Sequence, residues 1–181
     1  SLQYFFQKNR QNLIKNKILY PNYFYKKTVI NNLNHNSLAD KCANLDLYPF
    51  FSLDKYFNQI NKQAIKYNCH SIILSGESFF GSPQIWRINN ENEFYEEYKK
   101  KLQRLYNYIK NFDLHLILYL LPPEKWFESV VSNVIRYSGT LGKKVYENDE
   151  QFFSLMKPHL NYLELLNLWS KIINPHKFDV I

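Results

Sequence analysis

The chain has 181 residues, of which 45% are hydrophobic and 18% aromatic, and this composition predicts one folded domain and excludes a disordered chain. Its net charge of +7 comes from scattered lysines, and no basic cluster with interleaved aromatic residues points to a nucleic-acid partner. No apolar stretch is long enough to span a membrane, no signal segment opens the chain, and two isolated cysteines suit a reducing compartment, so we expect a cytoplasmic protein.

Hydrophobic spacing along the chain predicts helices that alternate with short strands. Apolar residues three and four apart predict the helices, and short apolar runs bounded by proline, glycine or polar residues predict the strands. In chain order the expected elements are a helix over 1–17, a strand over 18–21, helices over 35–43 and 52–68, a strand over 72–74, a helix over 94–109, a strand over 114–120, helices over 123–137, 150–156 and 160–173, and a strand over 177–181.

Residues with strong local preferences mark where several of these elements begin and end. Ser52 is expected to cap the helix that follows it, and Pro158 is expected to break the helix before it. Asn174 with Pro175 is expected to end the last helix. The segment 22–34 is predicted to be a polar loop.

The order of strands and helices predicts a parallel sheet. The strand over 72–74, the helix over 94–109 and the strand over 114–120 form the expected β-α-β crossover, because parallel strands need a long connection. His115, within the second of these strands, is interpreted as a buried core residue. We therefore expect one α/β domain over residues 1–181, whose fold is incomplete at both ends of the chain.

The stretch from Ser71 to Phe80 is the most compact candidate for a site. Three consecutive apolar residues, with no polar residue between them, are followed by Ser75 and Gly76. This pattern is typical of a strand buried on both faces in a parallel sheet. Ligands of open α/β sheets bind beyond the carboxyl ends of the strands, and Glu77 is expected to lie there as a proton acceptor or donor. The alternative is that Ser75 and Glu77 only cap the following loop or helix.

A second candidate lies at the start of the predicted helix over 123–137. Free backbone N–H groups at a helix N-terminus bind anions, and Ser129, one turn into this helix, is a candidate phosphate contact. The alternative is an exposed serine without a role. His35, at the start of the helix over 35–43, is interpreted as a capping or surface residue. No histidine pair has the spacing of a zinc site, so no metal is expected.

Five short motifs occur in the order of one known family. They are Ser1-Leu2-Gln3 with Leu19-Tyr20-Pro21, Asn34-His35 with Leu38-Ala39, the strand end Ile72 to Phe79, the segment Leu120 to Asn133, and Leu160 to Leu166 with Trp169. In this order they resemble the bacterial sulfotransferase-like family of the P-loop nucleotide-hydrolase superfamily, which is found around cell-surface polysaccharide genes. Together the motifs span nearly the whole chain.

The resemblance implies a three-layer fold, with a mostly parallel sheet flanked by helices. It implies transfer of a sulfuryl group from phosphoadenosine phosphosulfate (PAPS) to a hydroxyl of a carbohydrate or cell-surface polysaccharide. It implies Glu77 and His35 as catalytic residues, with Glu77 as the base that deprotonates the acceptor hydroxyl. It also implies that Ser1, at the end of the family's donor loop, and Ser129, at the donor's 3′-phosphate, bind PAPS.

The chain departs from the family pattern at two places. The Gly-rich donor loop with its lysine is expected upstream of Ser1, outside this chain. Leu121 and Pro122 stand where the family has arginines, so either Arg136 or Lys125 supplies the missing positive charge, or the donor differs, or the protein is inactive. The alternative functions are a P-loop kinase or nucleotide hydrolase, and an inactive sulfotransferase-like module in polysaccharide biosynthesis.

Overall fold

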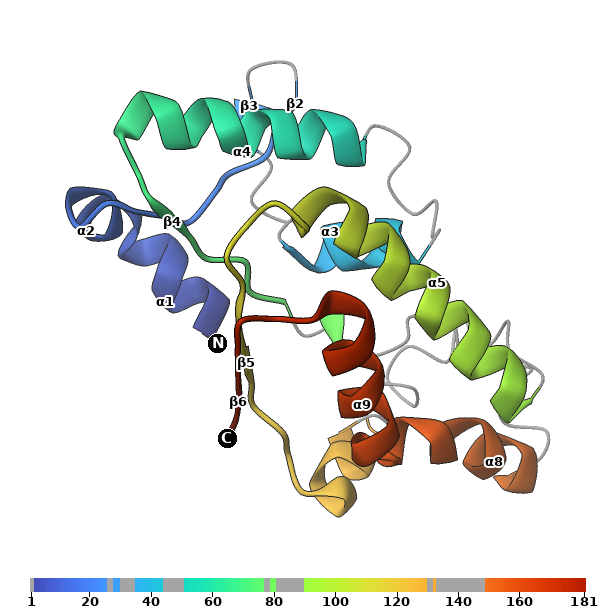
Figure 1. The fold of residues 1–181 in the computed structure, drawn as a ribbon. Coiled ribbons are helices and arrows are strands. Elements are labelled where there is room, and N and C mark those ends of the chain that lie inside the picture. The colour runs from blue at the N-terminus through green and yellow to red at the C-terminus, as the bar shows by residue number, and fades with distance from the viewer. Residues whose placement is uncertain are drawn as a thin grey trace. The chain divides into compact units, whose positions relative to one another are not determined.

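The chain folds into two compact units, Ser1–Pro83 and Gln84–Ile181. The computed structural model (Figure 1) describes residues 2–25, 28–29, 35–43, 51–76, 79–80, 90–129, 132 and 149–181. In each unit, helices accompany a short pair of parallel strands. The chain is therefore of mixed α/β character, as its sequence predicts.

The first unit is built around the parallel strands β1 and β4. Its described elements are α1 (Leu2–Lys8), α2 (Arg10–Lys15), β1 (Ile18–Leu19), β2 (Phe24–Tyr25), β3 (Thr28–Val29), α3 (His35–Cys42), α4 (Leu53–Tyr67) and β4 (Ser71–Ile72). Ile18 pairs with Ser71 and Leu19 with Ile72. The N–H of Ile73 extends this ladder by donating to the carbonyl of Leu19 at 2.9 Å. Helices α2 and α4 both pack against β1, and α3 packs against α4.

Helix α4 forms where the sequence predicts it, with the expected cap. The Ser52 hydroxyl accepts a hydrogen bond from the Lys55 N–H and so satisfies one of the free donors of the first turn. The helix ends at Asn68, whose φ of 50° is left-handed, a conformation that asparagine tolerates better than most residues. Its buried face consists of Tyr56, Phe57, Ile60 and Gln63.

Three features of the first unit differ from the sequence prediction. The predicted loop over 22–34 contains an antiparallel hairpin of β2 and β3, whose two-residue strands are too short to give a recognisable alternation. The predicted helix over 1–17 is divided at Asn9 into α1 and α2. Strand β4 is not buried on both faces, because Ser71 is exposed and Ile72 only half-buried.

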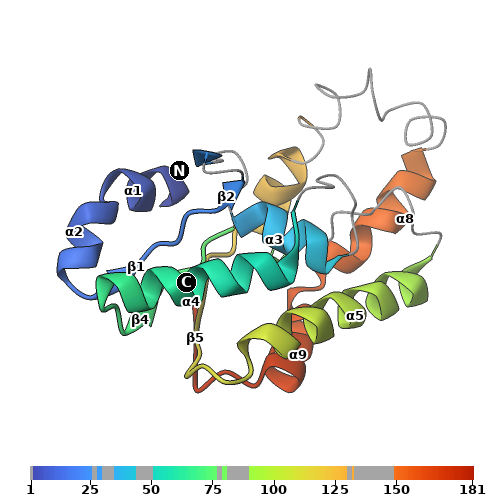
Figure 2. The ribbon, with the colours of Figure 1, turned by 90° about the horizontal axis from the view of Figure 1, so that it is seen from above.

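The second unit combines a parallel strand pair with a cluster of helices. Its described elements are α5 (Glu91–Ile109), β5 (His115–Leu118), an unlabelled helical stretch over 123–129, α8 (Asp149–Leu160), α9 (Tyr162–Ile173) and β6 (Lys177–Val180). Strands β5 and β6 pair in parallel from His115 with Lys177 to Leu118 with Val180. Helix α9 lies beside α5, as Figures 1 and 2 both show, and the buried indole N–H of Trp169 donates to the Tyr98 hydroxyl at 2.8 Å.

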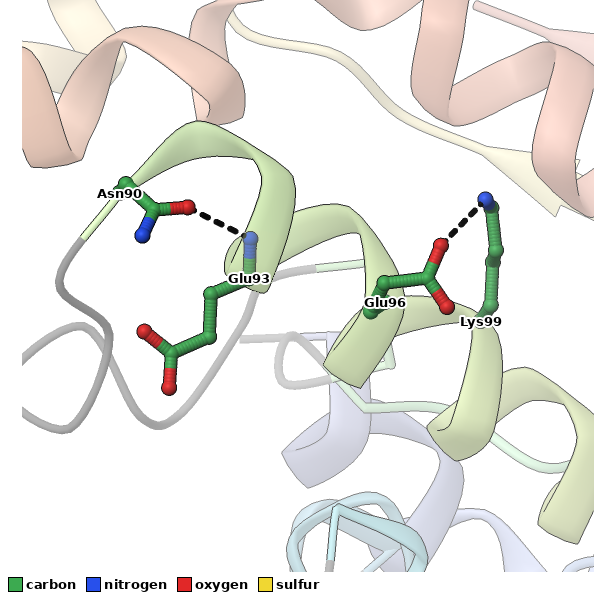
Figure 3. A network of polar contacts seen from close by, with 4 residues as sticks. All are labelled: Asn90, Glu93, Glu96 and Lys99. Atoms are coloured by element: carbon green, nitrogen blue, oxygen red, sulfur yellow. Dashed lines mark hydrogen bonds and ion pairs between the residues drawn. The ribbon is translucent and has the colours of Figure 1, made fainter.

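The long helix α5 begins with a cap and carries ion pairs on its exposed side (Figure 3). The Asn90 side chain accepts a hydrogen bond from the Glu93 N–H at 2.9 Å. The exposed Lys99 ammonium lies 2.8 Å from the Glu96 carboxylate, one turn earlier. Exposed pairs of this kind contribute little to the stability of a helix, because water screens the two charges. Helix α5 is thus held mainly by its cap and its buried face.

Pro158 lies inside α8 and does not break it, contrary to the sequence prediction. A proline removes one backbone hydrogen bond from a helix. The next residue, His159, packs its ring against Phe94 and Trp126, and this tertiary packing holds the last turn of α8 together.

The crossover that the sequence predicts between the strands at 72–74 and 114–120 stays a prediction. The structure pairs β4 with β1 and β5 with β6, and each of these parallel pairs is connected through intervening helices. Within the part of the chain that the structure describes, no helix is both long and apolar enough to cross a membrane.

Candidate active site

His35 joins the carboxyl ends of the two parallel strands of the first unit. It is the first residue of α3, and only 2% of its surface is exposed. Its Nδ1 accepts a hydrogen bond from the Ser75 N–H at 2.6 Å, beyond the end of β4. The ring also bonds to the backbone of Pro21, beyond the end of β1. Because proline has no N–H, the Pro21 carbonyl must accept this bond from Nε2–H.

These two bonds determine the protonation state of His35. A backbone N–H can donate only to an unprotonated ring nitrogen, so Nδ1 carries the lone pair and Nε2 the proton. Burial lowers the pKa of His35 to about 4, against a smaller raising effect from the bond to Pro21. The ring is therefore neutral near pH 7, and both nitrogens are already engaged. It is not the surface residue that its sequence position suggests.

Two tyrosine rings pack near the His35 ring. The centroid of the Tyr20 ring lies 4.7 Å from that of His35, in an edge-on arrangement, and that of Tyr56 lies 6.3 Å away. Neither tyrosine hydroxyl has a hydrogen-bond partner among the described residues. Burial raises the pKa of Tyr20 to about 12, and burial, followed by the electrostatic interaction between the two phenols, raises the pKa of Tyr56 well above its usual value. Both hydroxyls thus remain protonated donors beside His35.

Arg10 holds the segment that follows β1. Its Nε donates to the Tyr20 carbonyl at 2.8 Å, and one of its terminal nitrogens donates to the Gln63 side chain at 3.1 Å. The Gln63 amide in turn donates to the carbonyl of Asn22 at 2.8 Å and accepts from its N–H at 3.1 Å. Helices α2 and α4 therefore fix the backbone on both sides of Pro21, which keeps the Pro21 carbonyl in place for His35.

The sequence motifs did not identify Arg10, Tyr20, Tyr56 and Gln63 as parts of a site. A signal was present for two of them, because Tyr56 and Gln63 are seven residues apart and share one face of α4 with Ile60. The bond between His35 and Ser75 joins residues 40 positions apart, and no local pattern reveals it.

The predicted site residues are only partly covered by the structure. Glu77, Ser1 and Arg136 lie outside the described residues. His35 is brought to Ser75, two positions before Glu77 in the sequence. Ser129 belongs to the second unit, where it is exposed in the helical stretch over 123–129.

His115 is not a core residue, contrary to the sequence prediction. Its side chain is 44% exposed, and its Nε2 lies 2.7 Å from the Asp179 carboxylate, which also binds the Lys177 ammonium at 3.1 Å. The hydrogen bond with His115, followed by that with Lys177, lowers the pKa of Asp179. The error arose because an apolar run suggests a fully buried strand, whereas β5 alternates between exposed and covered residues.

The buried histidines predict that the protein loses stability in mild acid. The pKa of His35 is lowered to about 4 and that of His159 to about 3, mainly because burial disfavours the charged ring. In the unfolded chain both rings titrate near 6.5, so below that pH the unfolded chain binds protons that the folded chain does not. The free energy of unfolding is therefore highest above pH 6.5 and falls as the pH is lowered towards 4. Each ring lowers it by up to about 1.4 kcal/mol per pH unit. The urea midpoint should fall between pH 7 and pH 5, and a constant midpoint would contradict neutral buried rings.

The described residues contain no group of three or more histidine, cysteine, aspartate or glutamate side chains arranged to hold a metal ion. The polar groups of the site are instead backbone amides and carbonyls, one imidazole and two phenols. Comparisons with protein-family models, with curated proteins and with solved structures find no match to the chain.

Proposed function

We propose that the chain is a sulfotransferase that moves a sulfuryl group from PAPS to a hydroxyl of a carbohydrate or cell-surface polysaccharide. The finer fold that goes with this proposal is a three-layer, P-loop-like domain with a mostly parallel sheet. The observation that carries the proposal is the hydrogen bond between His35 and Ser75. It joins two sequence motifs of the sulfotransferase-like pattern at the carboxyl ends of parallel strands, where open α/β folds bind their ligands.

In the proposed reaction, Glu77 is the general base. The acceptor hydroxyl loses its proton to the Glu77 carboxylate, its oxygen forms a bond to the sulfur, and the bond from the sulfur to the donor phosphate breaks. Adenosine 3′,5′-bisphosphate leaves with the electron pair of that bond. A positioned carboxylate contributes about 10²–10⁴-fold to such a proton transfer.

His35 is a positioning residue in this proposal. Because both of its nitrogens bond to backbone, it has no free nitrogen to exchange a proton with a substrate. It instead holds the backbone at Ser75 and thereby the start of the segment that carries Glu77.

A transfer assay with labelled donor tests the proposal. The full-length protein, with the expected donor loop, is incubated with PAPS labelled at the sulfate and with a panel of oligosaccharides, and we expect label to appear in at least one of them. ATP labelled at the γ-phosphate is the matched control, and transfer from ATP alone would favour the P-loop kinase. Calorimetry with adenosine 3′,5′-bisphosphate accompanies the assay, because binding without transfer would favour the inactive module. Absence of both binding and transfer would contradict the proposal.

A further inference from the structure

Most of the positive charge of the chain belongs to the first unit. Residues 1–83 contain ten lysines and arginines and four aspartates and glutamates, a net charge of +6, whereas residues 84–181 carry a net charge of +1. The ranges 1–39 and 55–76 contain no acidic residue at all. These two ranges include α1, α2, β1, β4 and all of α4 except its first two residues. The net charge is therefore concentrated in the first unit, although the sequence shows it as scattered lysines.

Several of these cations gather where α4 ends and where β1 and β4 begin. The Arg10 guanidinium and the Lys66 ammonium both lie over the Tyr67 ring, at 5.4 and 5.3 Å from its centre. The face of an aromatic ring attracts cations, so one phenol holds two positive charges close together. The carbonyl of Lys17, the residue before β1, accepts a hydrogen bond from the His70 N–H at 2.9 Å, just before β4.

Exposed lysines extend this group of cations over the surface. Lys15 lies in the last turn of α2, and Lys62 lies one turn before Lys66 on α4. Both are exposed, as are Lys17 and Lys66. None of these four lysines forms an ion pair with another described residue. We call the group the basic surface, and it consists of Arg10, Lys15, Lys17, Lys62 and Lys66.

Several exposed lysines of the second unit are compensated within their own helices. Lys99 and Lys100 on α5 each pair with a glutamate one turn earlier, and the next residue, Lys101, is buried. Lys125 pairs in the same way with Glu128. A general surplus of lysine would affect both units alike, so it does not explain the basic surface. Positive charge that the fold leaves uncompensated in one region is complemented by a negatively charged partner.

The layout of the basic surface favours a long anion over a small one. Its cations come from α2, from α4 and from the residue before β1, and four of the five are exposed to water. Water and salt weaken each single contact, so tight binding needs a partner that meets several cations at once. A single-stranded nucleic acid would stack its bases on aromatic faces, but the half-exposed Tyr67 ring already lies against Arg10 and Lys66. An acidic polysaccharide needs no such ring.

We propose that the basic surface binds an acidic polysaccharide, a linear polymer with carboxylate or sulfate groups on its sugars. The choice of a polysaccharide among linear polyanions rests on the proposed function, whereas the polyanion-binding surface does not. Lys17 and His70 directly precede β1 and β4, so this surface lies at the amino ends of the two parallel strands. His35 lies at their carboxyl ends. The basic surface therefore retains a polymer outside the candidate active site.

Calorimetric titrations of the full-length protein with polygalacturonate and with chondroitin sulfate test this surface. One triple variant removes three of its charges: Lys15→Gln, Lys62→Gln and Lys66→Gln. A second triple variant is the matched control, since it removes three exposed charges from the second unit: Lys99→Gln, Lys100→Gln and Lys125→Gln. Both lower the net charge equally, so a difference between them reports the position of the charges. We expect the first variant to bind at least about tenfold more weakly than wild type, and the control to bind nearly as wild type does.

Two further measurements identify the kind of partner. Wild-type affinity should fall steeply as the salt concentration rises from about 50 to about 200 mM, because a polyanion releases counterions when it binds lysines. A single-stranded oligonucleotide with the same number of charges, and vesicles of phosphatidylglycerol, should bind more weakly than the polysaccharides. Tighter binding of either would overturn a polysaccharide as the partner, and an affinity that does not change with salt would overturn the surface.

The remaining outcomes separate this surface from the proposed function. Equal weakening in the two triple variants, or no binding of either polysaccharide by wild type, would overturn the surface. Binding that depends on the three lysines, without sulfuryl transfer in the labelled-donor assay, would support the surface and count against the proposed function. Thermal melts show whether the variants fold. If the first triple variant does not, Lys62→Gln is compared with Lys100→Gln, and weaker binding by Lys62→Gln supports the surface whereas equal binding overturns it.

Discussion

His35→Phe is expected to lower the free energy of unfolding by about 2–4 kcal/mol. Phenylalanine keeps a ring against Tyr20 and Tyr56, but it leaves the Ser75 N–H and the Pro21 carbonyl without their partner. Each buried polar group that loses its hydrogen bond costs about 1–3 kcal/mol. Urea unfolding at pH 7.5, followed by far-ultraviolet circular dichroism, measures the change.

His115→Phe is the matched control for this variant. His115 is a histidine of the same chain whose ring is 44% exposed, and exposed substitutions usually change stability by less than about 0.5 kcal/mol. If His35→Phe were as stable as His115→Phe, the strand ends would not depend on the His35 ring. His35→Phe should also lose its share of the acid sensitivity below pH 6.5, because it has no ring nitrogen to protonate.

Glu77→Gln is expected to slow sulfuryl transfer by about 100-fold or more. Glutamine has nearly the size of glutamate, but its amide cannot accept the proton of the acceptor hydroxyl at neutral pH. The rate constant is measured with PAPS and the oligosaccharide that the transfer assay identifies. The melting temperature should stay close to that of wild type.

Glu96→Gln is the control for a charge change elsewhere on the protein. Glu96 is an exposed residue whose ion pair with Lys99 contributes little, so this variant should transfer at the wild-type rate. An undiminished rate in Glu77→Gln would assign Glu77 to capping, the alternative that the sequence leaves open, and would remove the base from the proposed mechanism.

The amphipathic helices could be predicted from the sequence because their pattern is local. Helices α4, α5 and α9 are long enough to show several repeats of the helical spacing, and their ends carry residues with a strong preference for caps. The strands of the two parallel pairs contain two to four residues each, and so short a run carries little pattern. Their positions were predicted nearly correctly, but the burial of β4 and β5 was overestimated.

The polar residues were harder to interpret, because their surroundings come from distant parts of the chain. His35 could not be recognised as buried without the positions of Pro21 and Ser75. Lys101 is different, since it lies seven residues after Phe94 and shares the apolar face of α5 with Tyr98. A lysine at that spacing could have been singled out, but the run of three lysines hid it.

The two-residue pairing of β1 and β4 has a consequence for how this protein can change during evolution. A long ladder tolerates most single substitutions, because many backbone hydrogen bonds share the task of keeping two strands in register. Here the strand ends rely on one imidazole that contacts Ser75 and Pro21 at once. A replacement at position 35 must therefore be matched by new partners for both backbone groups, whereas positions 21 and 75 contribute only a backbone carbonyl and a backbone N–H, which other residue types could also supply.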